Sequence, residues 1–178
     1  MKIVILSVAP GSGKSSVARL LASKNERAVN LHTDDFYRYI SAGYVAPYLP
    51  EAHEQNAVIA KVMAACAAEY AGGGYTVYVD GIIGPWLLEP WRQAAQQAEV
   101  YYVILRPSLE TAISRATARI GERDLTDATI VRHMWQQFAD LGDYERNTID
   151  TTKQTVNESA ETIQKMISDG QFRLSRAL

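Results

Sequence analysis

The sequence predicts an α/β fold in which a mainly parallel sheet of about five strands is flanked by helices. Short apolar runs rich in β-branched residues alternate with stretches of helical periodicity, glycine and proline mark their boundaries, and polar residues follow several of the runs. With 178 residues the chain is long enough for one domain and short for two, so we expect one domain over residues 1–178.

Each element is predicted from its own local pattern. Strands are expected where apolar runs stop at turn residues or at a charge, and helices where apolar residues recur every three or four positions. The expected strands are residues 2–8, 27–32, 75–81, 100–106 and 146–151. The expected helices are residues 15–24, about 50–70, 108–120, 127–141 and 157–167. Because parallel strands end at one edge of a sheet, the polar residues that follow them should form a ligand site there.

Composition narrows the class of protein. The formal net charge of -2 gives no general basic field, so no nucleic-acid partner is expected. No apolar stretch approaches the roughly 20 residues of a membrane span, and the apolar start of the chain leads into a glycine loop rather than a cleavage site. We therefore expect a cytoplasmic protein without a membrane partner, as a monomer or a dimer. The single cysteine, Cys66, excludes an internal disulfide.

The stretch SVAPGSGKSS, residues 7–16, has the composition of a phosphate-binding loop between a strand and a helix. Its backbone N–H groups and the positive end of the helix can hold an anion, and its glycines permit the positive φ angles that this needs. Lys14 would reach the β and γ phosphates of ATP, and Ser15 would give its hydroxyl to Mg²⁺. The expected ATP contacts are Pro10, Gly11, Ser12, Gly13, Lys14, Ser15 and Ser16.

The match to the phosphate-loop pattern departs at one place, because Val8 stands where the first glycine is usual. A helix capped through a glycine turn, with Lys14 solvated, is the alternative. The sequence has no NKxD stretch, the motif that recognises guanine. Asp80 is followed by Gly81 rather than by the glutamate that hydrolytic ATPases often place there. A P-loop NTPase fold that transfers a phosphoryl group to a small acceptor is therefore the leading prediction.

A hydroxyl acceptor needs a carboxylate within hydrogen-bond reach to take its proton, and Asp34 or Asp35 could supply it. The segment TDDFYR resembles the DSFYR segment of uridine kinases, and its position is similar to that of the base aspartate in chloramphenicol phosphotransferases. This resemblance to P-loop small-molecule kinases implies that Asp34 is the base. Asp35, Tyr37 and Arg38 are then expected to contact the acceptor. A pair of aspartates that cap a helix or a turn is the alternative.

The stretch YVDGIIGPW is similar to the third-strand end of nucleoside and nucleoside monophosphate kinases. That similarity implies that Asp80 helps to hold hydrated Mg²⁺ or the acceptor. An Asp-Gly turn at a strand end is the alternative. The monophosphate kinases usually follow this Asp-Gly with an arginine that grips the acceptor phosphate. Ile82 stands there instead, which favours an uncharged acceptor.

Aromatic side chains concentrate in the segments that should frame the acceptor: Tyr37, Tyr39, Tyr44, Tyr48 and Trp86. Rings with polar edges suit a planar base, a sugar face or an aromatic drug-like molecule, and Trp86 is expected to contact the acceptor. The three histidines, His32, His53 and His133, have no spacing for a metal site and are interpreted as ordinary surface or boundary residues.

Arg115, Arg119 and Arg123 recur every four residues and so share one helix face. In the kinases that the chain resembles, a lid between two helices brings arginines over the transferring phosphoryl group. The resemblance implies a short lid at about 115–126, with Arg115 and Arg119 in catalysis and Arg119 also on the nucleotide. A solvated basic face is the alternative. Thr152 follows the last strand, where related kinases often contact adenine.

Together these residues predict an ATP-dependent, Mg²⁺-requiring kinase of a small hydroxyl-bearing molecule that is nucleoside-, sugar- or antibiotic-like. Two alternatives stay open: a nucleoside monophosphate kinase that acts on a nucleotide such as CMP, and a nucleotide-binding regulator without efficient transfer. An RNA-directed kinase is disfavoured by the acidic net charge and the lack of a basic stripe.

Overall fold

The computed structural model describes residues 1–7, 10–118 and 125–175, within which five parallel strands form one sheet. The strands are β1 (Lys2–Ser7), β2 (Ala28–His32), β3 (Thr76–Gly81), β4 (Glu99–Leu105) and β5 (Thr148–Ile149). They are hydrogen-bonded in the order β2-β3-β1-β4-β5, and each of these pairs is parallel. The predicted α/β fold with a mainly parallel five-stranded sheet is confirmed.

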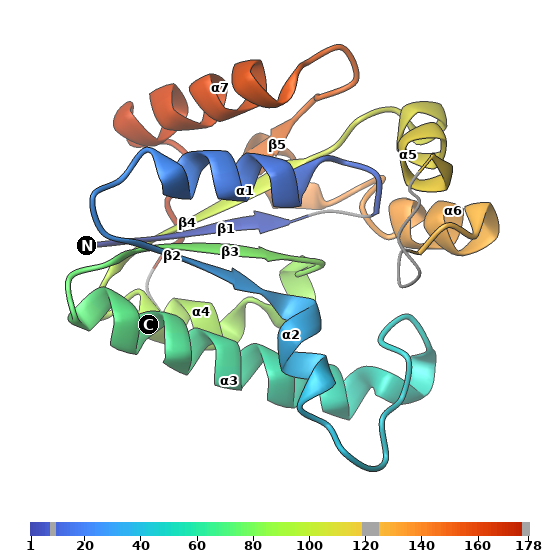
Figure 1. Cartoon of the computed structure of the whole chain (residues 1–178), viewed down its shortest axis with the longest axis horizontal. Helices are drawn as coiled ribbons and strands as arrows, with labels where there is room; N and C mark the ends of the chain where they lie inside the picture. The colour runs from blue at the N-terminus through green and yellow to red at the C-terminus, as the bar shows by residue number, and fades with distance from the viewer. Residues whose placement is uncertain (8–9, 119–124, 176–178) are drawn as a thin grey trace.

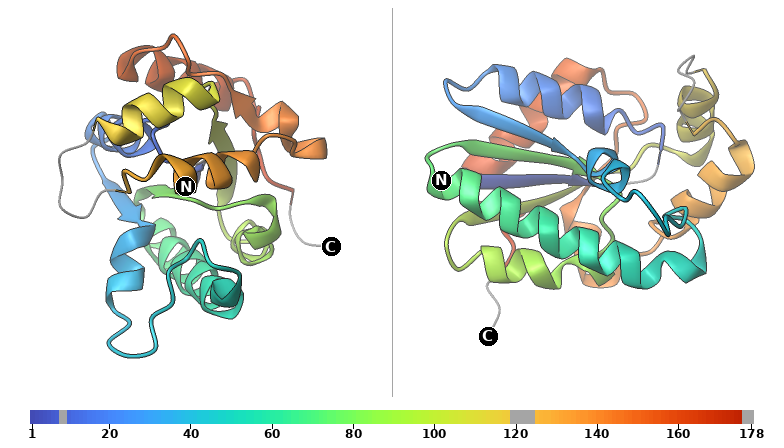
Figure 2. Two further views of the ribbon diagram at one scale, coloured as in Figure 1. Left: turned by 90° about the vertical axis from the view of Figure 1, so that its right-hand side faces the viewer. Right: turned by 60° about the horizontal axis from the view of Figure 1, so that its bottom comes forward.

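Helices cover both faces of the sheet and its carboxyl edge (Figure 1). They are α1 (Lys14–Ser23), α2 (Thr33–Arg38), α3 (His53–Gly72), α4 (Glu89–Ala94), α5 (Leu109–Thr117), α6 (Ala128–Gln136) and α7 (Val156–Ser168). α1 packs with α7 on one face, and α3 packs with α4 on the other. α5 and α6 pack on each other beyond the carboxyl ends of the strands, and Figure 2 shows α2 across from them. Helices from both halves of the chain therefore surround this edge.

The central strands are buried on both faces. In β1 the side chains from Ile3 to Ser7 lie in the interior, as do those from Val100 to Leu105 in β4. Trp91 of α4 is also fully buried against them. Removing this apolar surface from water supplies the main driving force for folding. Two-sided burial also explains why these strands appear in the sequence as continuous apolar runs.

Short elements differ from the sequence prediction. α2 and α4 are absent from it, because each has only 6 residues and too few turns to show a helical period. β5 pairs over two residues rather than over 146–151, since a 3₁₀ turn occupies the chain up to Asn147. α7 begins at Val156 because Thr155 and Glu158 form a capping box there.

Two side-chain clusters fix the carboxyl ends of the strands. Ser7 Oγ donates to Ile83 O at 2.7 Å and accepts from Ile83 N at 2.9 Å, and Tyr102 Oη donates to the same carbonyl at 2.7 Å. Arg106 donates to the two carboxylate oxygens of Glu145 at 2.8 and 2.6 Å. These hydrogen bonds hold the pKa of Glu145 below its usual range. They also tie the end of β4 to the chain that follows α6.

Gly11 is packed more tightly than Gly13, although both lie in the turn from β1 to α1. Both have positive φ, 84° and 87°, so alanine at either position costs about 1–2 kcal/mol of backbone strain. A Cβ on Gly11 would overlap the carbonyl oxygen of Ala112 in α5, whereas a Cβ on Gly13 meets open space. We predict that Gly11→Ala lowers the free energy of unfolding by about 1–3 kcal/mol more than Gly13→Ala, measured by urea denaturation. Equal losses would contradict tight packing of α5 on this turn.

Candidate active site

The turn after β1 leads directly into the N-terminus of α1. Gly13, in the left-handed conformation, accepts from Ser16 N and Val17 N at 3.1 Å each and so begins the helix. Lys14 and Ser12 are buried, and Ser12 Oγ has no hydrogen-bond partner in the part of the chain that the structure describes. Val8, the departure from the phosphate-loop pattern, lies outside the described residues. An anion at this turn would meet backbone N–H groups and a buried hydroxyl.

The register of the sheet places Asp80, near the end of β3, between the ends of β1 and β2. Its Cα pairs with Leu6 on β1 and with His32 on β2. The Asp80 side chain is fully buried, and within the described ranges neither carboxylate oxygen accepts a hydrogen bond. His32 Nε2 lies 3.4 Å from Asp80 Oδ2, and His32 Nδ1 lies 3.8 Å from Asp34 Oδ2. His32 therefore stands between two carboxylates.

The residues at this edge fit a Mg²⁺ site. Burying a carboxylate that accepts no hydrogen bond costs folding free energy unless a cation or a hydrogen-bond donor lies beside it. Asp80 is such a carboxylate. Residues 1–7, 10–118 and 125–175 contain no group of three or more His, Cys, Asp or Glu side chains that could hold a metal alone. Mg²⁺ commonly uses one or two protein oxygens together with substrate phosphates and water. Ser15 and Asp80 would be those protein groups.

The two aspartates of α2 have different surroundings. Asp35 Oδ1 accepts from Arg38 Nη1 at 2.5 Å and lies outside the cavity beside the helix. Asp34 lines that cavity, and 66% of its side-chain surface is exposed. A Cβ on Gly81 would overlap the side chain of Thr33, so glycine at this position lets α2 pack against the end of β3. The structure thus brings Asp34, rather than Asp35, toward the ligand space.

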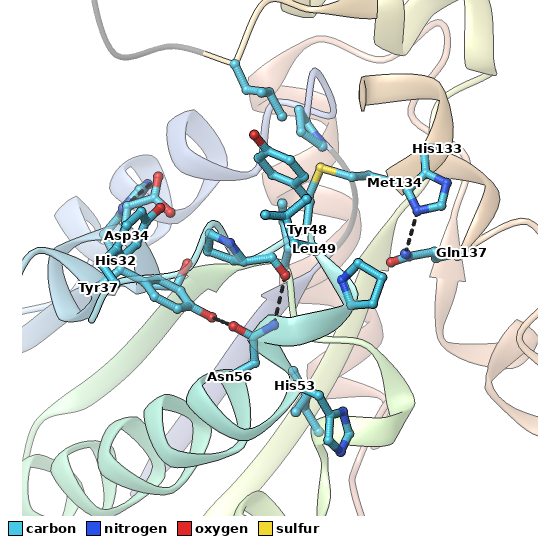
Figure 3. Close-up of a pocket in the computed structure, with 18 of the residues that line it drawn as sticks. His32, Asp34, Tyr37, Tyr48, Leu49, His53, Asn56, His133, Met134 and Gln137 are labelled. Carbon is cyan, nitrogen blue, oxygen red and sulfur yellow. Dashed lines mark hydrogen bonds and ion pairs between the residues drawn. The ribbon is translucent and has the colours of Figure 1, made fainter. Parts of the chain in front are cut away.

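A cavity of about 1000 Å³ opens beside the phosphate-loop turn (Figure 3). One wall comes from α2, the chain that follows it and the start of α3, and the other from α6 and the turn after β3. Lys14 and Asp34 both line it. Its aromatic lining consists of Tyr37, Tyr44, Tyr48 and Trp86. The volume is at the upper end of small-molecule pockets, so the cavity has room for more than a phosphate group.

Hydrogen bonds from α3 hold the first wall in place. Tyr37 Oη donates to Asn56 Oδ1 at 2.8 Å, and Asn56 Nδ2 donates to Pro47 O at 2.8 Å. The adjacent Gln55 accepts from Val45 N at 2.9 Å and donates to Val45 O at 2.7 Å. Burial, followed by nearby negative charge, raises the pKa of Tyr37 to about 12. The Tyr37 hydroxyl is therefore a neutral donor at physiological pH.

A model of the family described as chloramphenicol phosphotransferase-like protein matches residues 1–168. The chain belongs to this family. The resemblance to P-loop small-molecule kinases that the sequence predicted is thereby confirmed. Family and fold together support phosphotransferase activity on a small molecule.

Three solved kinases share the fold of this chloramphenicol phosphotransferase-like chain. A sugar kinase from Janibacter sp. HTCC2649 has a TM-score of 0.65 at 16% identity, over 94% of each chain. A gluconokinase from Sinorhizobium meliloti 1021 has a TM-score of 0.65 at 17% identity, over 96% of this chain and 93% of its own. Shikimate kinase from Acinetobacter baumannii, in complex with shikimate, has a TM-score of 0.62 at 17% identity, over 95% of this chain and 93% of its own. At such identities the likeness concerns the fold.

A curated human protein is similar over a shorter stretch. NEDD4-binding protein 2 is 48% identical over 56 residues, which is 30% of this chain and 3% of that protein. The similarity therefore concerns less than a third of this chain and a small part of NEDD4-binding protein 2.

The arginines expected in the lid are only partly within the described residues. Arg115, near the end of α5, donates to Thr151 O at 3.3 Å and to Thr152 O at 3.2 Å, both in the loop after β5. It does not line the cavity in this conformation. Arg119 and Arg123 lie outside the described residues, as does half of the expected lid. Arg115 here joins α5 to the loop where adenine is expected.

The Thr152 side chain makes hydrogen bonds within the protein. Its Oγ1 accepts from Ser108 N at 2.8 Å and donates to Asp150 Oδ1 at 2.5 Å. The Thr152 hydroxyl, and after it the Thr152 backbone N–H, hold the pKa of Asp150 below its usual range by donating hydrogen bonds to its carboxylate. Any nucleotide contact of Thr152 would therefore use its main chain rather than its hydroxyl.

Sequence reasoning gave several cavity residues no role, and it interpreted His53 and His133 as ordinary surface or boundary residues. His53 and His133 line the cavity, and His133 Nε2 lies 3.4 Å from Gln137 Nε2, one turn further along α6. The spacing of His133 and Gln137 on one helix face is the signal that could have found them. Tyr39, by contrast, is 77% exposed and lies outside the cavity.

Asp80→Asn tests whether the buried carboxylate serves a cation. The amide keeps the shape of the side chain and removes a buried charge, so we predict that the melting temperature without ligand does not fall. The additional stabilisation by MgATP over ATP with EDTA should be lost, because ligand stabilisation follows binding by mass action. A thermal-shift titration measures both quantities, with Asp35→Asn as the control. An unchanged Mg²⁺-dependent shift in Asp80→Asn would contradict the metal role.

Proposed function

We propose that this protein transfers the γ-phosphoryl group of ATP, in a Mg²⁺-dependent reaction, to a hydroxyl group of a small uncharged molecule. One observation carries the proposal: Lys14 from the phosphate-loop turn and Asp34 from α2 line the same cavity. Lys14 suits the phosphates of the donor, and Asp34 suits the hydroxyl group of the acceptor. A single cavity can therefore hold both reactants.

In the proposed step the acceptor oxygen forms a bond to the γ phosphorus while the bond to the β–γ bridging oxygen breaks. ADP leaves with that electron pair, and the hydroxyl proton passes to the Asp34 carboxylate. When bound, Mg²⁺ neutralises charge on the phosphates. Lys14 and the backbone donors of the turn orient the triphosphate, and the proposed lid residues Arg115 and Arg119 close over it when the lid moves. Most of the rate then comes from positioning and charge.

The charges around the cavity support an uncharged acceptor. Among the described residues that line it, the Lys and Arg side chains are Lys14 and Arg38, and Arg38 pairs with Asp35. No further cation is thus available for an acceptor phosphate in the described lining. Aromatic rings and the polar edges of Asn56 and His53 suit a hydroxylated ring compound instead. The names of the similar kinases, which include shikimate kinase and gluconokinase, agree with a hydroxyl acceptor.

The same proposal places the reaction in the cytoplasm, where ATP is available, with a small molecule rather than nucleic acid as acceptor. The net charge of -2 supports this choice, since nucleic-acid binding relies on basic surface. None of the helices that the structure describes has the length and apolar character of a membrane span.

An acceptor panel tests the proposal directly. Purified protein is mixed with MgATP and chloramphenicol, shikimate, gluconate, cytidine or CMP, and ADP formation is followed. We predict that chloramphenicol and cytidine, the uncharged compounds of the panel, accelerate ADP formation more than CMP does. Faster reaction with CMP would favour a nucleoside monophosphate kinase. ATP binding with no acceleration by any compound would favour a regulator without efficient transfer.

Comparing Asp34→Asn with Asp35→Asn tests which of the two aspartates is the base. Asp34→Asn should lower kcat by roughly 10²–10⁴-fold with ATP binding intact, because the hydroxyl proton loses its acceptor. Asp35→Asn should change kcat less than about threefold, since it disturbs only an exposed ion pair. Steady-state kinetics with the best panel acceptor measures both. Similar losses in the two variants would contradict the assignment of the base.

A further inference from the structure

Tyr37, Asn56 and Pro47 form a chain of two hydrogen bonds along one wall of the cavity. Tyr37 Oη lies 2.8 Å from Asn56 Oδ1, and Asn56 Nδ2 lies 2.8 Å from Pro47 O. Figure 3 shows both bonds meeting at the Asn56 side chain. All three residues line the cavity. The direction of each bond therefore decides what this wall offers to a bound molecule.

The chemistry of Pro47 fixes both directions. A carbonyl oxygen can only accept, so the Asn56 atom that faces Pro47 O must be the amide nitrogen. Asn56 Oδ1 also can only accept, and it faces Tyr37, so the Tyr37 hydroxyl must donate its single hydrogen to Asn56. Burial and, after it, the charge of Asp34 raise the pKa of Tyr37 to about 12, so this hydrogen is present at physiological pH. The Tyr37 oxygen then has only lone pairs for a bound molecule.

The Pro47 carbonyl is held in place by contacts on both sides. Gln55 accepts from Val45 N at 2.9 Å and donates to Val45 O at 2.7 Å, which anchors the chain before Pro47 to α3. Pro47 itself lies in a turn that is closed by a 3.0 Å hydrogen bond from Leu49 N. The carbonyl cannot turn away without breaking one of these contacts. The Tyr37 hydroxyl is therefore held in one direction by the wall around it.

Asp34 and Tyr37 lie three residues apart on α2 and both line the cavity, so they share one face of this helix. Under the proposed function, the Asp34 carboxylate takes the proton of the reacting hydroxyl group. We propose that the Tyr37 oxygen accepts a second hydrogen bond from the same molecule, so that the site selects diols and amino alcohols over simple alcohols. The inference rests on the proposed function and narrows its substrate class. Asn56 is a positioning residue that acts through Tyr37.

The expected selectivity follows from the energetics of an unpaired oxygen. In the free protein, water can donate to the Tyr37 oxygen. A molecule that displaces this water without offering a hydrogen leaves the oxygen unpaired, whereas a second O–H or N–H replaces the lost bond. We therefore expect the second donor to change kcat/KM by about 10–100-fold. The competing explanation is structural, with Tyr37 serving only to join α2 to α3.

The experiment measures kcat/KM by ADP formation from MgATP with chloramphenicol, with cytidine and with analogues of both. In the analogues each O–H in turn is replaced by hydrogen or by a methoxy group, which accepts but cannot donate, and each N–H is methylated. In wild type, one replacement should abolish transfer because it removes the reacting hydroxyl. A second replacement should lower kcat/KM about 10–100-fold, because it removes the hydrogen that Tyr37 accepts.

Tyr37→Phe removes the oxygen and keeps the ring. In this variant the second replacement should change kcat/KM by less than about threefold, because no lone pair remains to be satisfied. Tyr39→Phe is the matched control, since Tyr39 is 77% exposed and lies outside the cavity. It should keep the wild-type selectivity for the second donor.

Asn56→Leu tests the positioning role. Without Asn56 Oδ1 the Tyr37 hydroxyl can turn its hydrogen into the cavity and donate to a methoxy oxygen. The methoxy analogue should therefore recover relative to the deoxy analogue, by about 5-fold or more. This ratio compares two compounds on one variant, so a general loss of stability does not produce the change.

Three results would overturn the inference while transfer to a hydroxyl stands. They are equal use of all analogues that keep the reacting hydroxyl by wild type, wild-type selectivity in Tyr37→Phe, and an unchanged ratio of methoxy to deoxy analogue in Asn56→Leu. The failure of the proposed function looks different. In that case neither chloramphenicol nor cytidine accelerates ADP formation by wild type, and the role of Tyr37 in selecting the acceptor falls with it.

Discussion

The register of the parallel sheet is the constraint on which the site depends. It sets Asp80 beside Leu6 on one strand and beside His32 on another, so three segments far apart in the chain meet at one edge. The phosphate-loop turn follows β1, and α2, with Asp34, follows β2. A shift of one residue in β3 would turn the Asp80 side chain to the other face of the sheet. The buried carboxylate would then no longer lie beside the ends of β1 and β2.

The two sides of the cavity are built in different ways. On the side of the phosphate loop, backbone geometry dominates, because Gly11 lies against α5 and Gly13 begins α1. On the proposed acceptor side, side-chain hydrogen bonds dominate, because Asn56 and Gln55 of α3 hold the chain segment that carries Tyr44 and Tyr48. Substitutions in that segment can alter the ligand without disturbing the phosphate site. Such a division suits a fold that is shared by kinases of sugars, gluconate and shikimate.

Local signals made the sheet and the phosphate loop predictable from sequence, whereas tertiary contacts decided much of the rest. The apolar runs of β1 and β4 reflect burial on both faces. α2 and α4 are too short to show a period. The surroundings of Asp34 and Asp35 depend on Arg38 and on the cavity, which adjacent aspartates do not reveal. His32 was set aside as ordinary because its partner Asp80 is a cross-strand neighbour rather than a sequence neighbour.

Phosphoryl transfer to a hydroxyl is the central claim, and ³¹P nuclear magnetic resonance tests it most directly. Protein, MgATP and the best panel acceptor are incubated, and the phosphorus signals are followed over time. The account predicts that the γ-phosphate signal of ATP is replaced by that of a phosphomonoester on the acceptor, with ADP in equal amount. Release of inorganic phosphate alone, with the acceptor unmodified, would contradict it and indicate hydrolysis instead.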